Sequence, residues 1–114
     1  MSESLISYDD FARVDIRCGT IVAAEVFARA KNPSYKIKVD FGPVIGTLQT
    51  SAQVTVNYSC DQLIGRKVMG CVNLAPKNIA GFTSQFLLLG FSDRDNAIVL
   101  ATSSSDVPNG QKLH

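Results

Sequence analysis

The chain has a single histidine, three cysteines and no long apolar run, and each shortage excludes a class of protein. The histidine is the last residue, His114, and chain ends tend to fray, so Ser-His or Cys-His catalysis is not expected. Cys18, Cys60 and Cys71 are widely spaced without a C-x-x-C pair, which predicts neither a disulfide framework nor a zinc site. No apolar run approaches the roughly 20 residues of a membrane-spanning helix. We therefore expect a protein of the reducing cytoplasm, not inserted in a membrane.

Acidic residues are present, but their spacing is not that of a catalytic or metal site. Asp15, Glu25 and Asp40 are isolated in the sequence, and the glycines form no phosphate-binding loop. Catalysis needs a positioned acid, base, nucleophile or metal. Unless these carboxylates meet in space, the sequence predicts a binding module rather than an enzyme, with no metal or cofactor.

Basic and acidic residues are separated along the chain. The formal net charge of +1 argues against a generally basic coat that binds any polyanion. Cations gather in residues 29–38 and 66–77, whereas the last third of the chain is acidic. This pattern predicts either a local basic patch for binding or lysines that are simply solvated on exposed strand faces.

The apolar pattern predicts short β-strands. Residues 8–13 read as one or two helical turns, which Ser7 or Asp9 can cap. Alternation and β-branched residues indicate strands over residues 16–27, 35–41, 46–56, 67–74, 85–91 and 97–101, with a helical turn at 61–65. Because no long amphipathic helix is present, an all-β small antiparallel barrel is favoured over a βαβ fold. One domain, residues 1–114, is expected.

The segment from Asn73 to Ser84 is the most informative for function. An apolar run ends there in amide, ammonium and hydroxyl groups, while Gly81 lets the backbone turn. Lys77 suits a phosphate, whereas amides suit base edges and hydroxyls suit sugar or phosphate oxygens. The alternative for each residue is structural, with Asn73 completing a turn and Ser84 tying its own loop. The predicted recognition rim comprises Ser51, Gln53, Asn73, Lys77, Gly81, Phe82 and Ser84.

Several ordered motifs resemble the tRNA-binding domain family. They are Asp15–Ile21, Thr50–Gln53, Leu63–Val68, Val72–Lys77 and Gly81–Ser84, and the resemblance runs from about Tyr8 to the end. The segments Thr50–Gln53, Ile79–Phe82 and Val107–Gly110 are most similar to the CsaA proteins, described as protein-export chaperones. The chain departs from the family at residues 29–36, where the usual His and acid are missing, and at Gln85, where Glu is common.

The resemblance implies an OB-fold, a five-stranded antiparallel barrel with short helices and extra terminal strands, and a homodimer without catalysis. The expected function is that of a CsaA-type export chaperone binding unfolded or preprotein segments. The alternative is a free-standing, structure-specific tRNA-binding protein acting in translation. Arg17 and Gly19 match an early strand motif of the family, although Arg17 could instead form a buried salt bridge that sets the position of the strand.

The two hypotheses use different side chains. Polypeptide binding would use the apolar residues Tyr35, Ile79 and Phe82. Binding of tRNA would place phosphates on Lys36, Lys38 and Lys77, with Asn73 and Ser84 fixing the backbone. The apolar ends of the chain, Leu5-Ile6 and Ile98–Leu100, predict a surface for a second copy.

Overall fold

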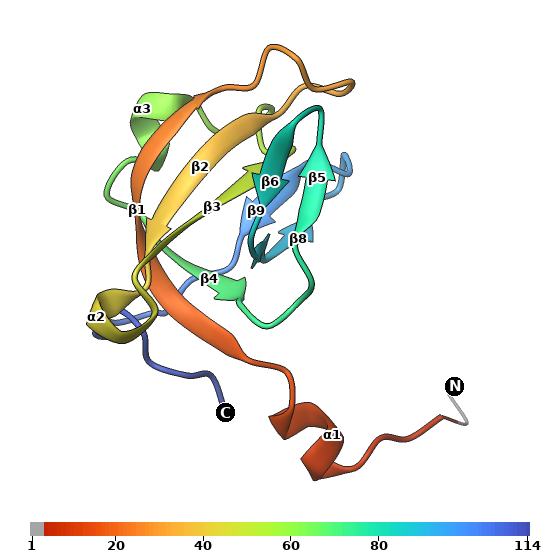
Figure 1. Cartoon of the computed structure of the whole chain (residues 1–114), viewed down its shortest axis with the longest axis vertical. Helices are drawn as coiled ribbons and strands as arrows, with labels where there is room; N and C mark the ends of the chain where they lie inside the picture. The colour runs from red at the N-terminus through yellow and green to blue at the C-terminus, as the bar shows by residue number, and fades with distance from the viewer. Residues whose placement is uncertain (1–3) are drawn as a thin grey trace.

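The longest strand of the protein, β1 (Ile16–Val26), pairs with a different neighbour along each half. In the computed structural model, which describes residues 4–114, its second half pairs with β2 (Tyr35–Asp40) and its first half with β4 (Lys67–Cys71). Strand β3 (Thr47–Ala52) lies beyond β2, and β7 (Leu87–Leu88) lies beyond β4. The result is a five-stranded antiparallel sheet of order β3-β2-β1-β4-β7 (Figure 1).

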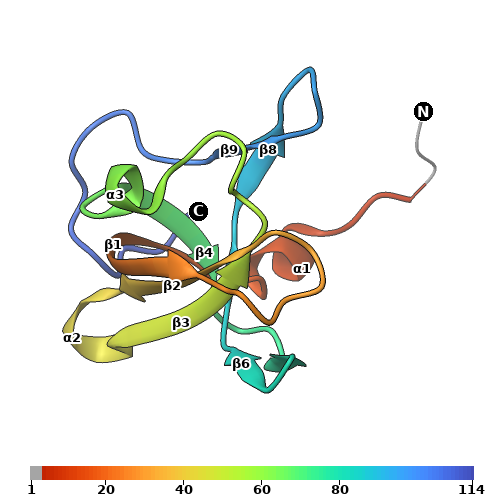
Figure 2. The ribbon, with the colours of Figure 1, turned by 90° about the horizontal axis from the view of Figure 1, so that it is seen from above.

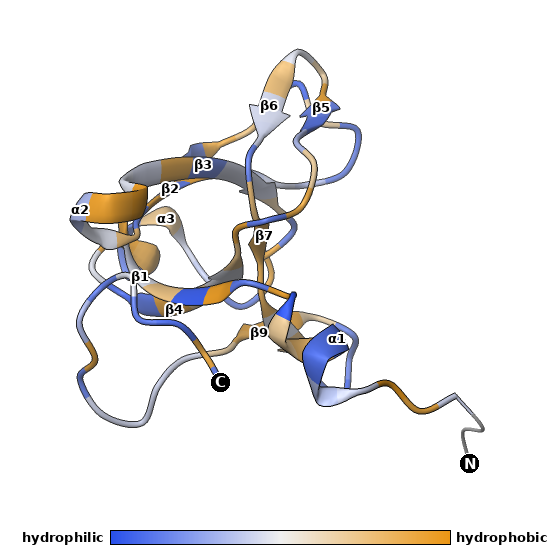
Figure 3. Cartoon of the chain, turned by 60° about the horizontal axis from the view of Figure 1, so that its bottom comes forward, coloured by the Kyte–Doolittle hydropathy of each residue, from blue (hydrophilic) through white to orange (hydrophobic). Residues whose placement is uncertain are grey.

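The sheet curls until its two edges nearly meet. A register shift between Ile21 and Ala23 interrupts the pairing of β1, and such bulges let a long strand bend. At the closing edge, the Gln85 amide donates to the Gln49 carbonyl at 2.8 Å, and the Thr50 hydroxyl donates to the Phe86 carbonyl at 2.7 Å. Figure 3 shows the resulting ring of strands. The predicted five-stranded OB-fold barrel is confirmed.

The barrel interior explains two glycines of the strands. The Phe41 and Phe86 rings meet edge to face, with their centroids 5.0 Å apart. A Cβ at Gly70 would lie 2.7 Å from the Phe86 ring, so only glycine fits beneath this pair. The same limit applies to Gly19, where a Cβ would lie 2.6 Å from Val39. The buried cluster is formed by Ile21, Tyr35, Ile37, Val39, Phe41, Val54, Leu63, Val68, Phe86 and Leu100.

The described residues form three short helices outside the barrel sheet. Of the two predicted caps, Ser7 and Asp9, it is Ser7 that caps α1 (Tyr8–Ala12), through a capping box with Asp10. Ser59 caps α3 (Cys60–Leu63) with Gln62 in the same way. The helix α2 (Gly42–Ile45) was not predicted from the sequence. In the part of the chain described, no helix has the length and apolar character needed to cross a membrane.

Two predicted strands are shorter than expected, and one is divided. The strand expected at 67–74 ends at Cys71. The strand expected at 46–56 ends at Ala52. The run 85–91 is divided between β7 and β8 (Gly90–Ser92), and β8 leaves the barrel sheet to pair with β9 (Ile98–Leu100). Cys18 and Cys71 are buried, and the three cysteines are free.

The segment predicted to be a polar rim contains a β-hairpin. Strand β5 (Lys77–Ile79) pairs with β6 (Phe82–Ser84) in a separate two-stranded sheet. Ala80 and Gly81, which connect the strands, have φ values of 49° and 82°. Two positive φ angles are typical of the tight turns of hairpins. The prediction that Gly81 supports a turn is confirmed, whereas the strands on either side were missed.

Candidate binding groove

The outer face of strands β1, β2 and β3 carries a large part of the predicted site. Ile37 and Val39 of β2 point into the core and are fully buried, so Lys36 and Lys38, which alternate with them, point outward. The pairing of β2 with β1 on one side and β3 on the other gives each lysine a cross-strand neighbour on both sides, so that three residues form a row across the sheet. One row is Glu25, Lys36 and Ser51, and the next is Ala23, Lys38 and Gln49.

The β5–β6 hairpin forms a wall beside this face. Figures 1 and 2 both show it next to β3. The Gln49 side-chain amide donates to the Thr83 carbonyl at 2.9 Å. The Ser84 hydroxyl lies 2.7 Å from the Thr50 hydroxyl and accepts the Ser51 backbone amide hydrogen at 3.3 Å. The hairpin is therefore fastened to β3 at its base, where Ser84 also lies directly opposite Lys77.

A groove lies between the sheet face and the hairpin. Its volume is about 430 Å³. The cations Lys36 and Lys38 and the acid Glu25 line it together with polar Gln49 and the aromatic ring of Phe82; the other lining residues are Ala23, Ala24 and Ile37. It thus offers charge, hydrogen-bonding groups and apolar surface to one ligand. Ligand sites in proteins commonly combine these three features.

An aromatic pair closes one side of the groove. The Phe82 ring on the hairpin meets the buried Phe27 ring, which follows β1, with centroids 5.4 Å apart. The Lys36 ammonium lies 5.0 Å from the centroid of Phe27 and 5.3 Å from that of Phe82. Such distances are within the range of cation–π attraction. Phe82, predicted as a site residue, is half-buried and faces the groove.

Cations of the groove are free of carboxylate partners. The ion pairs of residues 4–114 are Arg13–Asp10, Arg17–Asp15 and Lys67–Asp106. Lys36, Lys38 and the exposed Lys77 take part in none of them. These lysines can therefore bind an anionic group of a ligand without breaking an ion pair within the chain.

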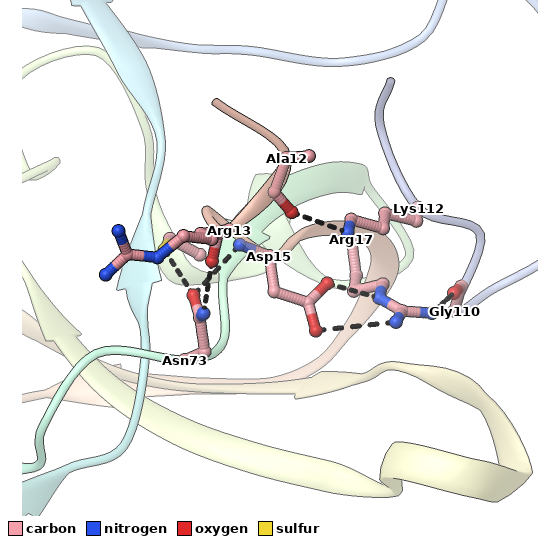
Figure 4. A network of polar contacts seen from close by, with 8 residues as sticks. Ala12, Arg13, Asp15, Arg17, Asn73, Gly110 and Lys112 are labelled. Carbon is pink, nitrogen blue, oxygen red and sulfur yellow. Dashed lines mark hydrogen bonds and ion pairs between the residues drawn. The ribbon is translucent and has the colours of Figure 1, made fainter. Parts of the chain in front are cut away.

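Asn73 lies outside the groove lining, and its amide is bonded within the chain. Its Oδ1 accepts the Asp15 backbone amide hydrogen at 2.9 Å, and its Nδ2 donates to the Arg13 carbonyl at 2.7 Å (Figure 4). The structural alternative for Asn73 therefore has direct support. A contact between Asn73 and a ligand stays a prediction, and these bonds do not favour it.

Arg17 belongs to the same network. Its Nε donates to the Asp15 carboxylate at 2.6 Å, and its Nη1 donates to the Gly110 carbonyl at 2.9 Å (Figure 4). The hydrogen bond that Arg17 donates to Asp15 raises the pKa of Arg17, against a smaller opposing effect of burial. The salt bridge with Asp15 is the alternative considered from the sequence, although the pair is part-exposed rather than buried, with 29% of the Arg17 and 27% of the Asp15 side chain accessible. The bond to Gly110 ties β1 to the C-terminal segment.

The remaining predicted residues differ in position. Gln53 is exposed just beyond β3, and Gly81 is exposed at the hairpin turn. Tyr35 is only 9% exposed, and its hydroxyl donates to the Tyr58 carbonyl, so the expectation of an apolar rim contact from Tyr35 is wrong. Ile79 is half-buried opposite Phe82.

Sequence reasoning missed Glu25 and Gln49 as groove residues, because only the strand register brings them beside the lysines. Phe27 was missed because its contact with Phe82 joins segments that are far apart in the sequence.

A family model described as "Putative tRNA binding domain" matches residues 16–112. Methionine--tRNA ligase of Flavobacterium johnsoniae is 34% identical over 112 residues, which are 98% of this chain and 15% of the ligase. Methionine--tRNA ligase of Methanococcoides burtonii is 38% identical over 113 residues, 98% of this chain and 16% of the ligase. The chain thus spans about one sixth of the length of these curated relatives.

Two solved structures resemble the chain over their whole length. The CsaA chaperone protein from Picrophilus torridus has a TM-score of 0.90 and 41% identity, covering 96% of this chain and 100% of that one. Chaperone CsaA from Bacillus anthracis has a TM-score of 0.91 and 37% identity, covering 97% and 100%. Taken with the match over residues 16–112, these findings show that the chain belongs to the tRNA-binding domain family.

Proposed function

We propose that this chain acts as a CsaA-type chaperone in the cytoplasm, binding unfolded or preprotein segments in the groove between the sheet face and the hairpin, with a role in protein export. The groove of about 430 Å³ carries this proposal, because it offers the Phe82 ring beside polar and charged groups. The likeness to two CsaA structures over full chain lengths supports it. We assign no catalytic step to this module.

The hydrogen-bonding groups of the groove suit an extended polypeptide. Gln49 donates through Nε2 to Thr83, so its Oε1 is left to accept, and Glu25 supplies further acceptors. A peptide backbone offers an N–H donor at each residue, and alternate side chains of an extended segment point to one face. One face of such a segment can therefore pack against Phe82 while its backbone meets Gln49.

Binding of tRNA is the second candidate. Lys36, Lys38 and Lys77 have no carboxylate partner among residues 4–114, and the matching family model is that of a tRNA-binding domain. Phosphates on these lysines would make the affinity depend on salt. Neutralising about four phosphates of single-stranded RNA gives a slope near 3 in log K against log salt.

We also propose a homodimer, as the family resemblance implied. Leu5 is 90% exposed and Ile6 70% exposed, on the segment that projects from the barrel ahead of α1 (Figure 1). Phe91 and Val99 are further exposed apolar residues, on strands β8 and β9. Leu100, which the sequence also offered for this surface, is instead buried in the core. Burial of the exposed residues against a second copy would remove apolar area from water.

One experiment separates the two ligand classes. A permanently unfolded protein, such as reduced and carboxymethylated lactalbumin, and a bulk tRNA preparation are each titrated with the same sample at several salt concentrations. We expect the unfolded protein to bind and to resist displacement by tRNA. Stronger binding of tRNA, with a steep salt dependence, would favour the second candidate. No binding of either probe would reject both.

A further inference from the structure

Two lysines of strand β2 share the groove, but their ammonium groups have different surroundings. Lys36 Nζ lies over the Phe27 and Phe82 rings, 5.0 and 5.3 Å from their centroids. Lys38 lies two residues further along the same outward face and also lines the groove. Its ammonium has no hydrogen-bond, ion-pair or ring partner within residues 4–114.

The Lys36 ammonium favours the rings over a neighbouring carboxylate. Glu25 is the direct cross-strand neighbour of Lys36 and lines the same groove. Nevertheless, the ion pairs of the described chain involve neither residue. The ammonium therefore lies at the junction between Phe27 and Phe82, at the edge of the groove that Lys36 and Phe82 both line.

That junction joins the hairpin to the barrel. Phe27 is 4% exposed and belongs to the barrel side, whereas Phe82 is the first residue of β6. The base of the hairpin is fastened to β3 through Ser84 and Gln49. The Phe27–Phe82 contact, with rings inclined at 61°, lies nearer to the turn at Ala80 and Gly81. A cation over both rings strengthens the attachment of this outer half of the hairpin.

We propose that Lys36 is a positioning residue that holds Phe82 and the β5–β6 hairpin in place as the groove wall, while Lys38 is the cation that contacts the ligand. This rests on the proposed function of the groove. Lys36 thus acts through Phe82, although both lysines have the same charge and lie on the same face of one strand.

Hydrogen exchange of the backbone amides of residues 77–84 tests the first half of the proposal without a ligand. Four variants are compared with the wild type: Lys36→Gln, Lys36→Arg, Lys38→Gln and, as a matched control on the exposed loop, Lys31→Gln. Loss of the cation in Lys36→Gln should speed exchange in the hairpin about 3- to 10-fold. Lys36→Arg should stay near the wild-type rate, because a guanidinium also stacks on aromatic rings. Neither Lys38→Gln nor Lys31→Gln should change it.

Binding tests the second half, with the unfolded-protein probe and a 20-nucleotide oligouridylate as probes. Lys38→Gln should weaken binding at low salt and reduce the salt slope for the RNA probe by about 0.7, the share of one phosphate contact. Lys36→Gln should weaken binding of either probe about 3- to 10-fold with an unchanged slope, since it disturbs the wall. Lys36→Arg should restore affinity.

Two results would overturn the proposal. One is that Lys36→Gln leaves hydrogen exchange in the hairpin unchanged and lowers the salt slope of RNA binding as much as Lys38→Gln does. Lys36 would then contact the ligand directly through its charge. The other is that Lys36→Arg speeds hydrogen exchange in the hairpin as much as Lys36→Gln does. If the wild type binds neither probe, the proposed function fails and the contact role of Lys38 fails with it, while the exchange comparison still decides whether Lys36 holds the hairpin.

Discussion

The side chain of Asn73 and the backbone of Asp15, 58 residues apart in the sequence, are joined by a hydrogen bond of 2.9 Å. A second bond, from Asn73 Nδ2 to the Arg13 carbonyl at 2.7 Å, fixes the same segment. The Val72 backbone amide also donates to the Asp15 carbonyl at 2.9 Å. Together these bonds hold the chain entering β1 against the chain leaving β4 (Figure 4).

Replacement of Asn73 by Ala should therefore lower stability rather than abolish binding. Loss of these two hydrogen bonds at an exposed site, and of a weak one from the Cys71 thiol at 3.5 Å, should lower the free energy of unfolding by about 1–2 kcal/mol. Urea denaturation measures this change. Gln53→Ala is the matched control, because Gln53 is an exposed amide that was also predicted to bind, and it should change stability by less than about 0.5 kcal/mol. Full stability with lost ligand binding in Asn73→Ala would show instead that Asn73 contacts the ligand.

The hairpin turn offers a stabilising substitution. Ala80 has a φ of 49°, a left-handed conformation that costs a residue with a Cβ roughly 1–2 kcal/mol, and Asn tolerates it better. Ala80→Asn should therefore slow hydrogen exchange in residues 77–84 and raise the free energy of unfolding by a few tenths of a kcal/mol. Ala28→Asn, on an exposed residue without a positive φ, is the control. Faster exchange in Ala80→Asn would contradict this account of the turn.

The β8–β9 hairpin should weaken in acid through Asp93. A hydrogen bond from the Asn57 side chain, then those from the Ala97 and Asp95 backbone amides, hold the pKa of Asp93 below its usual range. Since the unfolded chain has the higher pKa, this stabilisation is complete above the unfolded value and is lost as pH falls through the folded one. An NMR titration of the Asp93 carboxyl carbon measures the pKa. Asn57→Ala should raise it, and a wild-type value at or above the usual range would refute the assignment.

The dimer that we propose would be held by the exposed apolar residues ahead of α1. Replacing Leu5 and Ile6 together by Asp should give a monomer, because charged side chains would have to lose their water at the interface. Sedimentation at micromolar concentration measures the state of the wild type and the variant. Val44→Asp, at an exposed valine on α2, is the control and should remain dimeric. A wild type that sediments as a monomer would reject the proposed dimer.

Local patterns were enough to predict most of the barrel. Strict alternation in residues 35–41 placed Ile37 and Val39 inside, and thereby Lys36 and Lys38 on one outer face. Ser7 was one of two residues, with Asp9, expected to cap the first helix, and the structure shows that Ser7 is the cap. These features depend on neighbours close in the sequence, which is why the sequence reveals them.

Contacts between distant segments were not predictable in the same way. Tyr35 was expected at the rim, but its ring reaches the core and its hydroxyl bonds to the Tyr58 carbonyl, 23 residues away. Glu25 became a groove residue through the register of β1 with β2, which a single sequence does not fix. The β5–β6 hairpin was missed because Ala80 occupies its turn, where Asn, Asp or Gly normally marks a turn of this kind in the sequence.

NMR mapping of the binding site tests the central claim most directly. Isotope-labelled protein is titrated with the unfolded-protein probe, and backbone amide shifts are followed. The account predicts shifts confined to the groove and its wall, at residues 23–25, 36–38, 49–51 and 82–84, with none at residues 13–15 or 73. Saturable shifts centred on residues 13–15 and 73, with the groove unchanged, would contradict it.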